Sequence, residues 1–197
     1  MKDGLQCNIA LFSMDENNKR IIEHCKNGGY AAVFENGYIT IMKGTWKIRV
    51  VKVTEVPVTY GGKATHNIMN CLPAVLSTYF WRNISIEDIK LALQTFVPSP
   101  AQTPGRLNMF QFKQFKFLVD FAHNPAGLEL LCDFIGKMDG EPKVGIISGT
   151  GDRRDDDIKE LGRISGRSFD EIIIRQDKNL RGRTAEEIVS LLVDGIN

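Results

Sequence analysis

The apolar and polar positions in the first third of the chain alternate in short runs, which is the pattern of strands separated by turns. A helix is expected between the first two strands, beginning after Asp15 and ending at a pair of glycines. An Asn-Gly pair then predicts a tight hairpin turn. The expected elements are strands over 8–12 and 31–34, a helix over 16–27, the turn at 36–37 and a β-rich extension over 50–58.

Two helices are predicted next. Apolar residues recur at three- and four-residue spacing from His66 to Trp81, which predicts a helix buried along one face. Ser85, with Asp88 three residues later, is typical of a capping box and predicts a helix through Gln94. Residues 96–105 contain three prolines and a glycine, so they cannot continue that helix and form the expected hinge or domain boundary.

The rest of the chain predicts an α/β fold with a mainly parallel sheet. A hairpin is followed by helical patterns that separate two further strands, and such spacing implies βαβ crossovers. Ligands of parallel sheets collect at the carboxyl ends of the strands, where residues 120–124, 148–154 and 175–183 fall. The expected elements are the hairpin strands 107–112 and 115–121, helices over 126–137, 155–168 and 184–194, and strands over 144–148 and 171–175.

Composition describes an ordinary globular protein. The 197 residues are 43% hydrophobic, enough for one large domain or two small ones. A net charge of +1 gives no general reason to expect nucleic acid. No apolar run approaches the roughly 20 residues that cross a bilayer, and the first residues lack the apolar core of a signal peptide. A soluble, cytoplasmic protein with neither a membrane nor a nucleic-acid partner is therefore expected.

The cysteines and histidines give little support for a metal site. They are widely separated and form neither CxxC pairs nor an HExxH pattern. We expect reduced, mostly buried thiols and no metal held by this chain alone.

Five polar residues are candidates for nucleotide binding. Asn67 and Asn70 lie three residues apart on a predicted helix, and their amides can pair with a base edge. Arg106 follows Pro-Gly and presents a guanidinium suited to phosphate or to stacking on a base. Asp120 ends a strand, where its carboxylate can accept ribose hydroxyls, and His123 lies at a strand–helix corner. Each has a structural alternative. The asparagines and Asp120 can cap helices, Arg106 can form a surface ion pair, and the His123 imidazole can satisfy backbone groups.

A second set of charged residues follows the later strands. The loop 148–154 lies between a strand and a helix, but Arg154 stands where a dinucleotide-binding motif requires its third glycine. Asp152 with two arginines suits a zwitterionic or carboxylate-bearing substrate better than pyrophosphate. Asp177 follows the next strand in a charged loop that ends in RGR, and a purely solvated loop is the alternative there.

Taken together, these motifs resemble the Mur-type ligases and, among them, the cyanophycin synthetase family. The resemblance extends over nearly the whole chain and rests on GGKATHNIMN (61–70), PGRLN (104–108), DFAHNPAG (120–127) and GTGDRR (149–154). It implies the end of a Mur-type central ATPase domain over residues 1–103. A Rossmann-like C-terminal Mur ligase domain with a mainly parallel sheet follows over 104–197.

The resemblance also implies an activity. Ligases of this family use ATP and Mg²⁺ to convert a carboxylate into an acyl phosphate, which an amine then attacks. Here arginine would be added, through its α-amino group, to the β-carboxylate of aspartate in the poly-aspartate backbone of a cyanophycin chain. Gln176 departs from the family pattern, which has Glu there. The implied ATP-binding residues are Asn67, Asn70, Arg106, Asp120 and His123, and the implied substrate-binding residues are Asp152, Arg153, Arg154, Asp177, Arg181 and Arg183.

Part of the family's machinery is expected outside this chain. Its phosphate loop, its metal-binding glutamate and its modified lysine all precede the matching segment, so the 197 residues alone are expected to be inactive. Two alternatives stay open. One is another Mur-like ligase, of the peptidoglycan or folylpolyglutamate type, although the SPAQTPGRLN and RGR strings favour cyanophycin synthetase. The other is a non-catalytic module that binds a nucleotide or an amino acid. A homo-oligomer is compatible with the resemblance.

Overall fold

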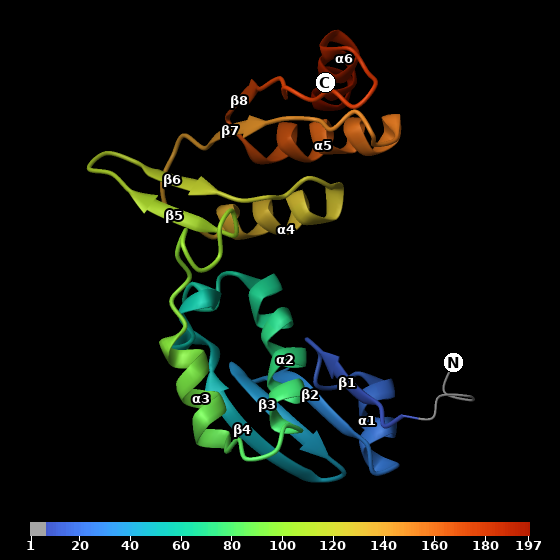
Figure 1. Cartoon of the computed structure of the whole chain (residues 1–197), viewed down its shortest axis with the longest axis vertical. Coiled ribbons are helices and arrows are strands. Elements are labelled where there is room, and N and C mark those ends of the chain that lie inside the picture. Colours follow the sequence, from blue (N-terminus) through green and yellow to red (C-terminus); the bar gives the residue numbers. More distant parts are fainter. Residues whose placement is uncertain (1–6) are drawn as a thin grey trace. The chain divides into compact units, whose positions relative to one another are not determined.

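The computed structural model describes residues 7–197, which form two compact units that divide between Pro98 and Ser99 (Figure 1). Each unit has its own hydrophobic core and is described by itself. Among the described residues, none of the helices combines the length and the apolar composition that a bilayer crossing requires.

The first unit is built on a four-stranded sheet with the order β1-β2-β3-β4. β1 runs parallel to β2, and the other neighbours are antiparallel. Asn36 and Gly37 join β2 to β3 with φ angles of 50° and 82°, which confirms the predicted hairpin turn. The elements are β1 (Ala10–Ser13), α1 (Lys19–Lys26), β2 (Tyr30–Glu35), β3 (Tyr38–Lys43) and β4 (Trp46–Lys52).

Helices cover both faces of this sheet. Successive residues of a strand point to opposite faces, so Ala32 of β2 packs with α2 (Thr65–Tyr79) and α3 (Ile86–Thr95). Its neighbours Ala31 and Val33 pack with α1 instead. Both predicted helices are confirmed, and the Ser-x-x-Asp capping box at the start of α3 is formed.

The start of α1 differs from the prediction. The helix begins at Lys19 with Asn18 as its N-cap, whose side chain accepts a hydrogen bond of 3.0 Å from the backbone N–H of Arg20. The predicted cap, Asp15, accepts instead from the N–H of Asn17 at 2.9 Å. Its carboxylate is therefore used in a turn that precedes the helix.

The β-rich extension predicted over 50–58 is wrong beyond β4. The chain forms two short 3₁₀ turns, Val53–Glu55 and Pro57–Thr59, because proline has no N–H with which to continue a strand ladder. The fully buried Thr59 holds these turns together. Its hydroxyl lies 2.6 Å from the carbonyl of Val53 and accepts a bond from the N–H of Gly62.

The second unit contains an antiparallel pair, β5–β6, and a parallel pair, β7–β8. The parallel pair confirms the predicted crossover topology. In the described residues these pairs are two separate sheets. The sequence pattern predicted one mainly parallel sheet. The elements are β5 (Asn108–Gln111), β6 (Lys116–Val119), α4 (Pro125–Gly136), β7 (Val144–Ile147), α5 (Asp155–Ser168), β8 (Glu171–Ile174) and α6 (Ala185–Ile196).

The core of this unit lies on one face of the parallel pair. Ile147 and Ile174 point into a cluster formed by α4, α5 and α6. The alternate residues Val144, Ile146 and Ile173 are exposed, as the two-residue period of a strand requires. This arrangement leaves the carboxyl ends of β7 and β8 beside the start of α5 and the start of α6, where the candidate residues lie.

The hairpin carries an aromatic face. Phe110 lies opposite Phe117 in the register, and Phe112 stacks on Phe115 with ring centroids 4.8 Å apart. All four rings are exposed.

Candidate functional site

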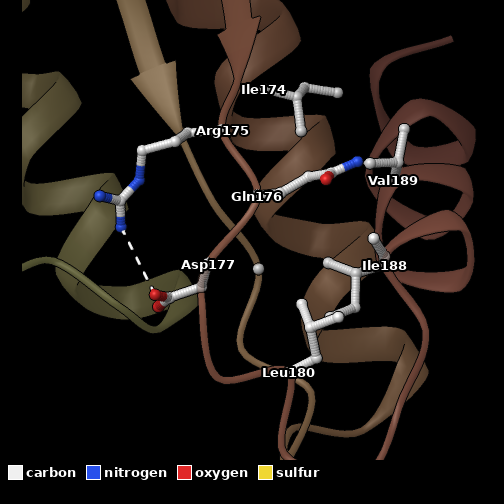
Figure 2. Close-up of a pocket in the computed structure, with 9 residues that line it drawn as sticks. Ile174, Arg175, Gln176, Asp177, Leu180, Ile188 and Val189 are labelled. Carbon is white, nitrogen blue, oxygen red and sulfur yellow. Dashed lines mark ion pairs between the residues drawn. The ribbon is translucent and has the colours of Figure 1, made fainter.

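Two loops meet at the carboxyl ends of the parallel strands. The glycine loop, residues 148–154, follows β7, and the second loop, residues 175–183, follows β8. Figure 2 shows a small cavity that residues of the second loop and of α6 line, with Gly149 of the glycine loop. Its volume is about 10 Å³, room for roughly one water molecule. The cavity itself is therefore too small for a nucleotide or an amino acid.

Residues at the end of β8 point alternately to two sides. In Figure 2, Ile174 and Gln176 point toward Val189 of α6, whereas Arg175 and Asp177 lie on the opposite side. A guanidinium nitrogen of Arg175 lies 3.9 Å from a carboxylate oxygen of Asp177. The alternation separates Gln176, the departure from the family pattern, from the charged side that carries Asp177.

Asp152 is already paired with a guanidinium. Arg181 of the second loop donates from Nη1 to Asp152 Oδ2 at 2.5 Å. That hydrogen bond is the main cause that lowers the pKa of Asp152 below its ordinary value. Two predicted substrate-binding residues thus contact each other across the loops, and the Asp152 carboxylate is paired with a guanidinium of the same chain.

The two arginines after Asp152 have different surroundings. Arg154 forms a two-pronged ion pair with Asp157 in the first turn of α5, with bonds of 3.0 and 2.9 Å. Arg153 is half-buried, and its Nε has no hydrogen-bond partner among the described residues; the same holds for Thr150 Oγ1. Buried polar atoms without partners are rare and costly, so these two atoms are the unusual polar groups of the glycine loop.

Arg183 contacts the glycine loop directly. Its guanidinium donates to the carbonyls of Gly151 and Arg153 and pairs with Asp155. The sequence predicted a substrate contact here, but the structure engages these donors within the chain.

The predicted nucleotide-binding residues of the second unit gather around the hairpin. Arg106 is exposed, and its guanidinium carbon lies 5.3 Å from the centroid of the Phe121 ring. Asp120 accepts from the N–H of Leu107 at 2.9 Å and from the N–H of Ala122 at 2.8 Å. His123 Nδ1 lies 3.0 Å from the carbonyl of Phe121. Each Asp120 oxygen keeps a further lone pair, so the carboxylate can still accept a ligand hydroxyl.

Asn124 caps α4, since its side chain accepts from the N–H of Gly127 at 2.8 Å. Sequence reasoning missed Asn108, which is buried and fixes the turn that presents Arg106. Its Oδ1 accepts from the N–H of Gly105 at 2.7 Å, and its Nδ2 donates to the carbonyl of Thr103 at 3.0 Å. An asparagine three residues after the glycine of a Pro-Gly turn was the available signal.

Asn67 and Asn70 lie on α2, in the first unit. Asn70 is exposed, whereas the amide of Asn67 donates to the carbonyl of Val58 at 2.7 Å. The helix places both residues on neighbouring positions, as predicted. Asn67 therefore also holds the 3₁₀ segment against the start of α2.

Metal ligands are not gathered anywhere in residues 7–197: no group of three or more His, Cys, Asp or Glu side chains could hold an ion. The four cysteines are free thiols, with Cys25 and Cys71 buried.

Comparison with known proteins identifies relatives of both units. Residues 105–196 match the family model of the Mur ligase, glutamate ligase domain. Cyanophycin synthetase from Synechocystis sp. is 42% identical over 196 residues, which cover the whole of this chain but 22% of that protein. Cyanophycin synthetase from Crocosphaera subtropica is also 42% identical, with the same coverage. The chain thus spans about a fifth of the length of the curated relatives it matches.

Solved structures share the fold. Folylpolyglutamate synthase from Thermotoga maritima superposes with a TM-score of 0.57 at 16% identity, covering 94% of this chain and 44% of the other. At that identity the similarity describes the fold alone.

Proposed function

We propose that the chain, whose residues 105–196 match the Mur ligase, glutamate ligase domain family, is part of an ATP-dependent ligase of the cyanophycin synthetase type. The reaction is the addition of arginine, through its α-amino group, to the β-carboxylate of aspartate in a poly-aspartate backbone. The observation that carries this proposal is the 42% identity over the full chain, together with a charged loop pair at the end of a parallel sheet.

The loop pair has the charges that arginine and a carboxylate require. Asp152 and Asp177 supply carboxylates for a guanidinium or an ammonium group, and a substrate guanidinium at Asp152 would replace its present contact with Arg181. Arg153 Nε and Thr150 Oγ1 are buried in this structure, so they would donate to a substrate carboxylate only after a movement of the loop. Arg154 and Arg181 add positive charge at the rim. The α-amino group of arginine can then remain free to attack an acyl phosphate.

Fewer side chains support the proposed ATP-binding site. Arg106 offers an exposed guanidinium for phosphate or base contact, and Asp120 offers lone pairs for ribose hydroxyls. Asn67, Asn70 and His123 complete the proposed set. ATP supplies the phosphoryl group that activates the carboxylate. Mg²⁺ ligands are assigned to no residue of this chain, because the described residues contain no suitable cluster.

The test is a ligation assay with the longer protein that contains this chain. A short poly-aspartate primer, ATP and Mg²⁺ are incubated with arginine, lysine, glutamate or diaminopimelate in parallel, and ADP release and primer mass are measured. The proposal expects ADP release that depends on both primer and arginine, and a mass gain of one arginine per aspartate. ADP release that follows glutamate or diaminopimelate would assign the chain to a folylpolyglutamate or peptidoglycan type of ligase instead.

A further inference from the structure

The guanidinium of Arg183 is the main side-chain link between the two loops. Its Nε donates to the carbonyl of Gly151 at 3.0 Å, and its Nη2 donates to the carbonyl of Arg153, also at 3.0 Å. Nη2 also lies 2.7 Å from Asp155 Oδ1. One side chain therefore contacts both ends of the three-residue turn 151–153 and the first residue of α5.

The backbones of the two loops are also in direct contact. A Cβ atom built on Gly151 would lie 2.0 Å from the carbonyl oxygen of Leu180 and 3.4 Å from Cβ of Arg183. The first distance is far below any real contact, so only glycine allows this approach. Because the two backbones lie this close together, the Arg183 side chain can reach the carbonyls of the glycine loop.

Arg183 itself has a fixed base. Its N–H donates to the carbonyl of Leu180 at 3.1 Å, which closes a turn through Arg181 (φ 49°) and Gly182 (φ 91°). The next residue, Thr184, is the N-cap of α6 and forms a capping box with Glu187. The backbone of Arg183 is therefore fixed next to the start of α6. Its side chain reaches from there to the glycine loop.

From these contacts we infer that Arg183 is a positioning residue: it holds the glycine loop in the conformation in which Thr150 Oγ1 and Arg153 Nε are buried without a hydrogen-bond partner among the described residues. Its side chain is 26% exposed, and its guanidinium makes three contacts with the glycine loop and the first residue of α5, which is the geometry of a residue that holds the loop. An effect of Arg183 on arginine binding rests on the proposed function. An effect of Arg183 on the conformation of the glycine loop does not. Arginine suits the role because its planar fork reaches two carbonyls at once, and the single ammonium of lysine does not.

The loop is tested by amide hydrogen exchange of the 197-residue chain, measured by NMR. In Arg183→Ala, exchange of the amides from Gly151 to Arg154 should accelerate at least about tenfold, while amides in the middle of α5 and α6 keep their rates. Arg183→Lys should restore part of the protection. Lys178→Ala removes a positive charge from the same loop and should leave the rates unchanged. If Arg183→Ala does not fold, Arg183→Gln, which retains a single donor group, takes its place.

Wild-type exchange rates in Arg183→Ala would overturn the inference. Full protection in Arg183→Lys would also overturn it, because charge alone would then suffice. Titration of the same variants with L-arginine adds a second readout. Arg183→Ala should weaken arginine binding at least fivefold relative to Lys178→Ala. If the wild-type chain binds no arginine while loop exchange still accelerates, the positioning role stands and the proposed substrate is wrong.

Discussion

At the scale of single residues, the structure engages most of the predicted site residues in contacts within the chain. Arg154 pairs with Asp157, Asp120 accepts two backbone N–H groups, and Arg183 holds the glycine loop. Sequence patterns identify which charged side chains lie near a strand end. They do not show which residue each of these side chains contacts. For Arg181 and Arg183 the partner lies in a loop about 30 residues away along the chain.

The pair formed by Asp152 and Arg181 gives a prediction at this scale. Because the hydrogen bond from Arg181 lowers the pKa of Asp152, Arg181→Ala should raise that pKa toward the ordinary carboxyl value. A carboxyl whose pKa is lower in the folded state contributes stability above its unfolded pKa, and this contribution is lost as the pH falls through the folded pKa. The pair should therefore persist at neutral pH and break in acid.

The measurement is a pH titration of the Asp152 carboxyl carbon by NMR. An Asp152 midpoint that does not move in Arg181→Ala would mean that the contact is absent in solution.

At the scale of elements, the strongest sequence signals were right and the weak ones failed for local reasons. The capping box at Ser85 and the turn at Asn36-Gly37 are confirmed, because each combines a required backbone geometry with a residue that favours it. The strand expected near Pro57 became a 3₁₀ turn that the buried Thr59 hydroxyl stabilises. A tertiary contact of that kind leaves no periodic pattern in the sequence.

The packing of α5 against α6 gives a prediction at this scale. A Cβ atom on Gly162 would lie 2.1 Å from the carbonyl oxygen of Leu192, and one on Gly195 would lie 1.9 Å from that of Lys159. The helices cross so closely that a methyl group forces them apart. Gly162→Ala should therefore lower the free energy of unfolding by about 2 to 3 kcal/mol.

Urea unfolding followed by circular dichroism measures this effect. Gly136→Ala is the matched control, because it is also helical and has nothing within 4 Å of a built Cβ. The control should be neutral or up to about 1 kcal/mol more stable. Equal effects of the two substitutions would contradict the close crossing of α5 and α6.

At the scale of the whole molecule, the fold class was predictable from the sequence, whereas the composition of the site was not. The order of helices and strands indicated the parallel pair and its carboxyl edge, and β7 and β8 confirm it. The residues proposed for the nucleotide lie in both units, and those proposed for arginine lie in the second. Binding of ATP and arginine by these residues is a property of the ligation reaction, so it is tested by the kinetics of the longer protein.

The most direct test of the account is the substrate dependence of Asp177→Asn in the longer protein. Asp177 lies on the charged side of the β8 end, where a carboxylate would recognise the guanidinium of arginine (Figure 2). Steady-state rates are measured with arginine and ATP varied in turn. The account predicts that KM for arginine rises at least about tenfold, equivalent to roughly 1.4 kcal/mol, while KM for ATP changes less than twofold. Equal changes in both constants, or a change confined to ATP, would contradict an arginine site at the carboxyl edge of this sheet.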